Sequence, residues 1–296
     1  MNILVTGASG LLGGHIVSRF AGAHNVTGVD RNPWWGERCI QFFQGDLSES
    51  AFLRDIILRS SPDVLIHSAG MIDVDGCENN PDQALQSNVE ITSTLVENTP
   101  PQCKFVYIST DAVFSGASSF WQETDEPKPL NVYARTKFEG ERATVKASTH
   151  LILRTNFYGW SSGRKKTAAE WLHQALRDGE PINLFDDFFT TPIYAADLAR
   201  CLEATVNSGY RGLLHLAGKD RVSKYEFGLA MGRLMGVSMS NVRRGSLAEA
   251  KFAAPRAKDI SLGTERARAL LGFEMPGCEQ GLRRFLSDQA KPLSQR

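Results

Sequence analysis

Hydrophobic positions along this chain fall into short continuous runs that alternate with longer segments in which apolar residues recur every three or four positions. Short runs of this kind predict strands buried on both faces, and the longer spacing predicts amphipathic helices. The expected strands are residues 2–6, 25–29 (ending in Asp30), 42–44, 64–67, 104–109 and 150–154. The expected helices between them are residues 10–21, 49–60, 81–98 and 133–147. Such alternation predicts an α/β fold with a doubly wound parallel sheet.

Beyond residue 155 the pattern loosens. Helices are expected at 167–177, 224–235 and 264–271, and a short strand running into a helix at 193–206. We therefore expect a sheet domain over 1–155, completed by about 190–216, and a smaller lobe formed by 156–189 and 217–296. Because no Pro/Gly/Ser-rich linker separates the two parts, we expect them to share a tight cleft.

Composition excludes several classes of protein. The 296 residues carry 33 basic and 33 acidic side chains, so net charge favours neither nucleic acid nor an anionic membrane. No apolar stretch approaches the ~20 residues of a membrane span, and the first apolar run stops too early for a signal peptide. The five cysteines are odd in number and widely spaced, which predicts reduced thiols in the cytoplasm and no bound metal.

Three glycines follow the first expected strand and open the first expected helix. Gly7 permits a tight turn, Gly10 lets the backbone approach a pyrophosphate, and Gly13 lets the helix pack on the strand. The N–H groups at the helix N-terminus can then bind phosphate. The dinucleotide contacts expected here are Gly7, Ser9, Gly10, Leu11, Leu12 and Gly13.

Acidic residues after the next two strands bear on cofactor choice. Asp30 can accept hydrogen bonds from both ribose hydroxyls and repels a 2′-phosphate, which favours NAD(H). Arg31 could instead pair with that phosphate and favour NADP(H), so either cofactor is expected, with a preference for NAD(H). Asp46 and Leu47 should lie near the adenine, although Asp46 could equally cap the helix that begins near Ser48.

Tyr133 and Lys137 stand four residues apart, on one face of an expected helix. A free phenol has a pKa of ~10, and a lysine ammonium one turn away is expected to lower the pKa of Tyr133 toward the range useful for acid–base catalysis. Thr110, at the end of an expected strand, offers a hydroxyl to a carbonyl oxygen. With the glycine turn, these residues predict a carbonyl–alcohol oxidoreductase; the alternative is a purely structural pair.

These motifs resemble the extended short-chain dehydrogenase/reductases, and within them the dTDP-4-dehydrorhamnose reductase group. The similar segments span nearly the whole chain in the family's order. They are V-T-G-A-S-G-L-L-G (5–13), G-D-L (45–47), P-D-V-L-I-H-S-A-G (62–70), N-V-E-I-T (88–92), I-S-T-D-A-V-F-S-G (108–116), P-L-N-V-Y-A-R-T-K-F-E-G-E (129–141), L-R-T-N-F-Y-G (153–159), T-P-I-Y-A-A-D-L-A (191–199) and R-A-K-D-I-S-L (256–262).

The resemblance implies a Rossmann domain with a smaller, mostly C-terminal α/β substrate lobe. It implies an NAD(P)-dependent reductase of the keto group of a 4-keto-6-deoxy sugar nucleotide. Thr110 would polarise the carbonyl, Tyr133 would serve as acid–base and Lys137 as its lysine. The segment Ser68, Ala69 and Gly70 would pass along the cofactor, and Asn88 would buttress the site.

A second anion site is needed for the diphosphate of a nucleotide sugar. Arg256 is the preferred candidate, because it lies in a family-like segment and a guanidinium can grip a phosphate with two hydrogen bonds. Asn156 is expected to meet the same ligand. Arg256 could alternatively brace a C-terminal helix, and the basic run 164–166 is a further candidate that could also be a solvated loop.

Two departures leave the sugar open. Ala112 stands where the family usually has an aromatic residue, and Ala257 where it often has proline. One rival function is an epimerase or dehydratase, for which Asp111 could act as the acid but Ala112 replaces the usual glutamate. The other rival is a cofactor-binding regulatory subunit without activity. A homodimer is the candidate assembly.

Overall fold

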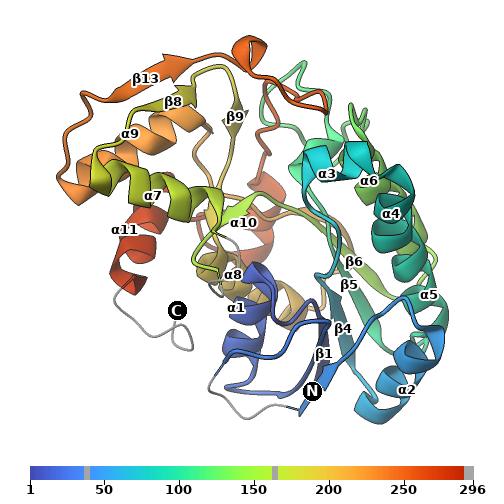
Figure 1. Cartoon of the computed structure of the whole chain (residues 1–296). Helices are drawn as coiled ribbons and strands as arrows, with labels where there is room; N and C mark the ends of the chain where they lie inside the picture. Colours follow the sequence, from blue (N-terminus) through green and yellow to red (C-terminus); the bar gives the residue numbers. More distant parts are fainter. Residues whose placement is uncertain (37–40, 162–165, 290–296) are drawn as a thin grey trace.

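The computed structural model describes residues 1–36, 41–161 and 166–289, which form a seven-stranded sheet domain with a second lobe beside it (Figure 1). Every strand pairing within the large sheet is parallel. The order across the sheet is β11 (Gly212–His215), β6 (His150–Arg154), β5 (Lys104–Ile108), β4 (Val64–His67), β1 (Asn2–Thr6), β2 (Asn25–Asp30) and β3 (Gln41–Gln44). The order reverses between β4 and β1, so a crevice is expected at the carboxyl ends of these two strands.

Both faces of this sheet are buried, which explains the continuous apolar strands. In β1, Ile3 and Val5 join the core on one face, and Leu4 joins the core on the other. The first core is covered by α1 (Leu11–Phe20), α8 (Ala195–Asn207) and α10 (Glu265–Leu271). The second is covered by α2 (Ser50–Ser60) and α5 (Ile91–Asn98), with α6 (Val132–Thr144) beside α5. The α/β doubly wound fold is therefore confirmed.

The helix expected over 81–98 forms, but with an irregular centre. It runs as α4 (Pro81–Leu85), a π-helical turn η1 (Gln86–Glu90) and α5. Asn88 lies in this wider turn and is 1% exposed. Its side-chain amide binds the backbone N–H and C=O of Met71 and donates to the hydroxyl of Thr136 on α6. Asn88 thus ties the segment after β4 to the helix that carries Tyr133, in the supporting place that was expected.

The second lobe has its own core, around Tyr158, Trp160 and Phe285. Its larger elements are α7 (Ala168–Asp178), β8 (Ile182–Phe185), α9 (Lys224–Met235), β13 (Val242–Gly245) and α11 (Cys278–Asp288). Its short strands are β7 (Phe157–Tyr158), β9 (Phe189–Thr190), β10 (Ile193–Tyr194) and β12 (Val222–Ser223). In Figure 1 this lobe lies at the upper left, beside the sheet domain.

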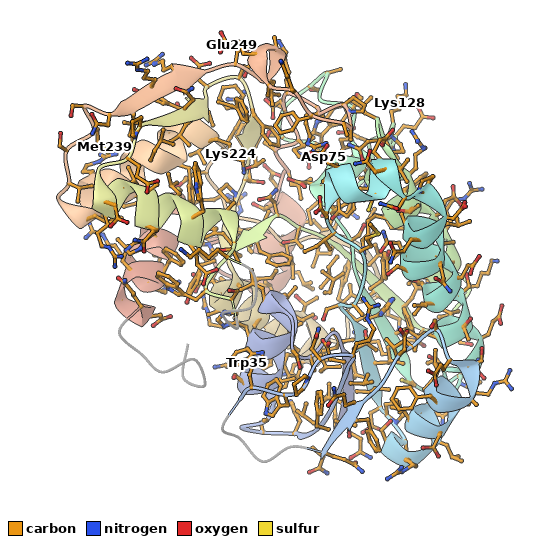
Figure 2. The ribbon with its side chains drawn as sticks, viewed as in Figure 1. Trp35, Asp75, Lys128, Lys224, Met239 and Glu249 are labelled. Atoms are coloured by element: carbon orange, nitrogen blue, oxygen red, sulfur yellow. The ribbon has the colours of Figure 1, made fainter. Side chains whose placement is uncertain are left out.

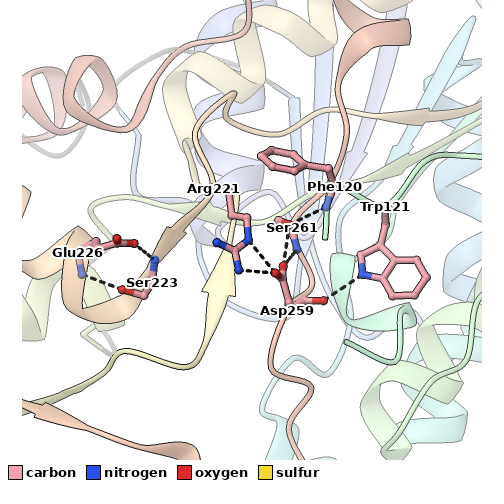
Figure 3. A network of polar contacts seen from close by, with 7 residues as sticks. All are labelled: Phe120, Trp121, Arg221, Ser223, Glu226, Asp259 and Ser261. Carbon is pink, nitrogen blue, oxygen red and sulfur yellow. Dashed lines mark hydrogen bonds and ion pairs between the residues drawn. The ribbon is translucent and has the colours of Figure 1, made fainter. Parts of the chain in front are cut away.

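A polar network joins distant segments where the chain returns to the sheet domain (Figure 3). The carboxylate of Asp259 accepts from the N–H and hydroxyl of Ser261 and pairs with Arg221 at 2.6 Å. The indole of Trp121 donates to the backbone oxygen of Asp259, and the N–H of Phe120 donates to Ser261. The segment 256–262 therefore has a structural role, because it links residues 120–121 to Arg221.

Three further elements lie near the sheet's carboxyl end or in the second lobe. They are α3 (Val74–Asn79) and the 3₁₀ turns η2 (Asp111–Val113) and η3 (Leu247–Glu249). In the described ranges no helix has the length and apolar character to span a bilayer. The same ranges contain no group of three His, Cys, Asp or Glu side chains suited to a metal ion. The free cysteines 77, 103, 201 and 278 are buried, and Cys39 lies outside the described residues.

Candidate active site

The turn after β1 requires glycine. Gly7 has φ +70°, and a Cβ on it would lie 2.7 Å from the backbone nitrogen of Ala69. A Cβ on Gly13 would lie 2.0 Å from the backbone oxygen of Gly7. Larger residues would therefore push α1 off the turn and the turn off the segment after β4.

The N-terminus of α1 is suited to an anion. Gly10 occupies the cap position, and no side chain of the described chain caps this helix. The first backbone N–H groups, those of Leu11 and Leu12, therefore remain available beside the glycine turn. These features fit the pyrophosphate of a dinucleotide.

Asp30 lies at the end of β2 and holds the adjoining loop. One carboxylate oxygen accepts from the N–H of Ser9 at 3.1 Å, and the other accepts from the N–H of Asn32 at 2.8 Å. Each carboxylate oxygen can accept more than one hydrogen bond, so Asp30 retains capacity for a ribose. Arg31 is 70% exposed and lies 3.7 Å from the carboxylate of Asp46. A 2′-phosphate would have to compete with Asp46 for this guanidinium.

The structure excludes one of the two alternatives raised for Asp46, the helix cap. Its carboxylate accepts from the N–H of Ser48 at 2.9 Å, and this bond is the main reason that its pKa is lowered. Helix α2 begins at Ser50 with Glu49 in the cap position, so the expectation that Asp46 caps this helix is wrong. Asp46 instead stabilises the turn before it, with Leu47 buried behind.

The segment after β4, which we expect to pass along the cofactor, lies against the glycine turn. The hydroxyl of Ser68 donates to the backbone oxygen of Thr6 at 2.6 Å, and the N–H of Ala69 donates to the hydroxyl of Thr6. A Cβ on Gly70 would lie 2.7 Å from the side-chain oxygen of Asn88. These contacts place residues 68–70 between the glycine turn and η1.

Lys137 is buried beneath the carboxyl end of β5. Its ammonium nitrogen donates to the backbone oxygen of Ile108 at 2.7 Å and lies 4.1 Å from the ring centre of Tyr107. Burial lowers the pKa of Lys137 to about 7, and nearby Glu141 only partly opposes this. Glu141 itself pairs with buried Arg154 at 2.7 Å. Near neutrality the amine is therefore poised between its two protonation states.

The expectation that Lys137 lowers the pKa of Tyr133 is wrong in this structure. The pKa of Tyr133 is raised to about 12, mainly by burial and to a smaller extent by the charges of Asp111 and Cys77. A hydrogen bond with Thr110 acts in the opposite direction but is outweighed. The reason is that a phenolate loses more from desolvation here than it gains from its neighbours. Tyr133 therefore keeps its proton at neutral pH, as a proton donor must.

Thr110 connects Tyr133 to a buried carboxyl group. Its hydroxyl caps η2 by accepting from the N–H of Ala112, and it donates to Asp111 at 3.2 Å. Asp111 is 2% exposed, and the amide of Asn156 donates to its other oxygen at 2.8 Å. Burial raises the pKa of Asp111 to about 7, while Asn156, Lys224 and Thr110 lower it. The predicted residues Thr110, Tyr133 and Asn156 thus gather around Asp111.

Sequence reasoning did not find Lys224. It is the first residue of α9, and its ammonium lies 5.1 Å from the ring centre of Phe188. Burial lowers the pKa of Lys224, and the charge of Asp111 opposes this. No motif marks this lysine; the surrounding S-K-Y-E is explained by the capping box of Ser223 and Glu226. Only the fold brings it toward the carboxyl end of β5.

The structure places Arg256 in contacts with protein groups. Its guanidinium pairs with Asp75 of α3 at 3.1 Å, donates to the backbone oxygen of Ala254 and stacks over Phe252. It therefore braces the end of the second lobe against the sheet domain, in place of the C-terminal helix considered above. Lys166 is exposed just before α7. The candidates Arg164 and Lys165 lie outside the described residues.

Comparison with known sequences gives consistent matches over the whole length. The family described as RmlD substrate binding domain matches residues 1–291. The chain is 28% identical to the probable low-salt glycan biosynthesis reductase Agl14 of Haloferax volcanii, covering 95% of this chain and 96% of that protein. It is 28% identical to dTDP-4-dehydrorhamnose reductase of Mycobacterium tuberculosis, covering 92% and 87%. It is also 28% identical to methionine adenosyltransferase 2 subunit beta of Bos taurus, covering 97% and 89%.

Solved structures agree with these matches. A dTDP-4-dehydrorhamnose reductase from Bacillus anthracis in complex with NADP is 25% identical and covers 97% of this chain and 98% of its own, with a TM-score of 0.86. MoeE5 in complex with UDP-glucuronic acid and NAD is 26% identical, with the same coverage and a TM-score of 0.82. The neighbours thus include complexes with each of the two nicotinamide dinucleotides.

Proposed function

The chain belongs to the RmlD substrate binding domain family, and from that membership we propose that it is an NAD(P)-dependent reductase of the keto group of a 4-keto-6-deoxy sugar nucleotide. The observation that carries this proposal is the interaction of the Tyr133 phenol with the Thr110 side chain, with Lys137 one turn farther along α6. These groups lie at the carboxyl end of β5, and the glycine turn follows β1 in the same sheet. A nicotinamide and a carbonyl could therefore meet there.

The chain's own residues orient and protonate the substrate. When bound, the dinucleotide supplies a hydride to the keto carbon. Thr110 and Tyr133 donate hydrogen bonds to the carbonyl oxygen, and Tyr133 delivers its proton to that oxygen as negative charge develops there. A pKa of about 12 keeps Tyr133 protonated until this moment. Lys137 would hold the ribose of the cofactor and, in its ammonium form, would place positive charge beside the phenol.

For the cofactor, we propose a preference for NAD(H). Two features support it: the carboxylate of Asp30 at the end of β2, and the ion pair that engages Arg31 with Asp46. A 2′-phosphate would meet the first charge and would have to displace the second. Both NAD and NADP occur in complexes of similar proteins, so the binding of a nicotinamide dinucleotide is common to them.

For the substrate, we propose the division expected from the sequence: residues 1–155 with about 190–216 bind the cofactor, and 156–189 with 217–296 bind the nucleotide sugar. Asn156 supports this, because it reaches Asp111 from the start of the second part. Arg256 remains our candidate for the diphosphate, and binding would require it to exchange Asp75 for phosphate. The homodimer and the cytoplasmic location remain predictions.

The rival functions explain the site less well. A protonated Asp111 could serve as the acid of a dehydratase. The methyl group of Ala112, however, cannot remove a proton as the usual glutamate at this position would. A purely regulatory subunit would have no need of a buried Lys137 beside Tyr133. Burying an amine is costly and is more readily explained by catalysis.

The test is a screen of the purified protein against 4-keto sugar nucleotides with NADH or NADPH, following the absorbance of the reduced nicotinamide. If the protein is a reductase, one equivalent of reduced cofactor should be oxidised for each substrate molecule consumed. An epimerase or dehydratase would change the sugar without net cofactor loss. Tight cofactor binding with every substrate unchanged would instead favour the regulatory subunit.

A further inference from the structure

Lys224 of the second lobe lies near the hydroxyl groups of Thr110 and Tyr133. Lys224 begins α9, and Figure 2 shows it on the side of the second lobe that faces the sheet domain. Its charge and that of Asp111 act on each other across the junction of the two parts. Asp111 follows β5 of the sheet domain, so this coupling exists only when both parts are assembled.

Thr110 has a single hydroxyl proton, which can be donated either to Asp111 or to a substrate carbonyl, but not to both at once. In the structure it donates this proton to Asp111, which leaves its lone pairs to accept from Tyr133 or from the N–H of Ala112. With the proton directed at Asp111, Thr110 cannot donate to a substrate carbonyl. If Asp111 is protonated, the carboxyl O–H can donate to Thr110, and the hydroxyl proton of Thr110 is free to turn toward the substrate.

We propose that Asp111 is a positioning residue whose protonated form turns the Thr110 hydroxyl toward the carbonyl oxygen, and that Lys224 sets how readily Asp111 takes up that proton. The inference rests on the proposed reductase function. Asp111 touches neither hydride nor carbonyl in this account and acts only through Thr110. Lys224 acts in turn through Asp111, from the first turn of α9 in the second lobe.

The surroundings of Asp111 support this arrangement. The groups that face it are Thr110, Asn156 from the segment after β6, Lys224 from α9 and Tyr133 from α6. Asn156 can only donate through its amide nitrogen and holds one carboxylate oxygen, which leaves the other for exchange with Thr110. Burial places the pKa of Asp111 at about 7, so both forms are present near neutrality.

The first test is the pH dependence of kcat/KM for reduction. Because the protonated form is the competent one, wild-type activity should fall as pH rises through the pKa of Asp111. In Lys224→Met the loss of positive charge raises that pKa, so the falling limb should move to higher pH by about one unit. Lys224→Arg should restore the wild-type limb. Asp111→Asn, whose amide can always donate to Thr110, should remove the limb.

The matched control is Lys219→Met, which removes an exposed lysine from the same part of the chain. It should leave the limb in place. A limb that stays unmoved in both Asp111→Asn and Lys224→Met would overturn the proposal, because the titrating group would then be another one, such as Lys137.

The second test does not need turnover. Infrared spectra of the protein without ligands should show a carboxyl C=O band, absent from Asp111→Asn, that disappears as pH rises through neutrality. In Lys224→Met the band should persist to higher pH. If no such band distinguishes wild type from Asp111→Asn, the proposal fails even for an active reductase. If the band behaves as expected but no keto sugar is reduced, it is the reductase function that fails.

Discussion

Replacing Lys137 by Met should show how much the burial of this amine lowers the free energy of unfolding. Burial takes the pKa of this amine from 10.5 to about 7. Because the unfolded chain binds more protons than the folded one between these values, the wild type gains stability as pH rises through this window. Met cannot titrate, so the variant lacks this gain.

The magnitude follows from the shift. At ~1.4 kcal/mol per pKa unit, the penalty for burying the amine is roughly 4 kcal/mol at about pH 7 and roughly 2 kcal/mol at about pH 9. The variant also loses the hydrogen bond to Ile108, worth about 1–3 kcal/mol, and the contact with Tyr107, worth about 0.5–2 kcal/mol. The cation–π part of the Tyr107 contact exists only for the ammonium form and is already included in the shifted pKa. The remaining losses do not depend on pH, so they cancel in the comparison.

Urea unfolding of both proteins at these two pH values measures the effect. We expect the stability of Lys137→Met relative to wild type to be about 2 kcal/mol greater near pH 7 than near pH 9. Lys146→Met, which removes an exposed lysine just beyond α6, should show no such change. A pH-independent difference for Lys137→Met would refute the argument, because the amine would then have the same pKa in the folded and unfolded chains.

Three other substitutions test the remaining roles. Tyr133→Phe keeps the ring and should lower turnover ~10²- to 10⁴-fold with little change in cofactor affinity measured by titration; wild-type turnover would disprove the assignment. Asp30→Ala should erase the preference for NADH in kcat/KM, whereas a wild type that already prefers NADPH tenfold or more would show that Arg31 dominates. Arg256→Met should raise the KM for the nucleotide sugar by a factor equivalent to about 1.5–3 kcal/mol and should leave the KM for the dinucleotide within about twofold. An equal rise in both constants would show that Arg256 acts only structurally, through its ion pair with Asp75.

The first half of the chain could be predicted from its sequence because local and global signals coincide there. Strands buried on both faces are continuous apolar runs, so residues 64–67 and 150–154 were delimited to the residue. The glycines were readable for a similar reason: Gly7 and Gly13 lie where any side chain would collide with backbone. A steric requirement of this kind appears directly in the residue type.

The second lobe was less predictable because its elements depend on distant partners. Strand β13 reads V-R-R-G and pairs only with the short β8, so neither apolar alternation nor length identifies it. Helix α11 was missed although Leu282 and Phe285 are buried, since its remaining positions are mostly polar or small.

The same limit applies to the site. Tyr133 and Lys137 were found because a helix spaces them, whereas Lys224 is brought near Asp111 only by the tertiary fold. The direction of the pKa shift of Tyr133 was also beyond the sequence. It depends on burial, which outweighs the charge expected from a neighbour on the same helix.

The most direct test of the central claim follows a labelled hydride. Purified protein is given a 4-keto-6-deoxy sugar nucleotide and a nicotinamide cofactor that carries deuterium at the transferred position, and the product is analysed by mass spectrometry and NMR. The reductase account predicts one deuterium on the former keto carbon for each cofactor oxidised, and a rate ~10²- to 10⁴-fold lower in Tyr133→Phe. A sugar product without deuterium, or bound cofactor that is never oxidised, would contradict it.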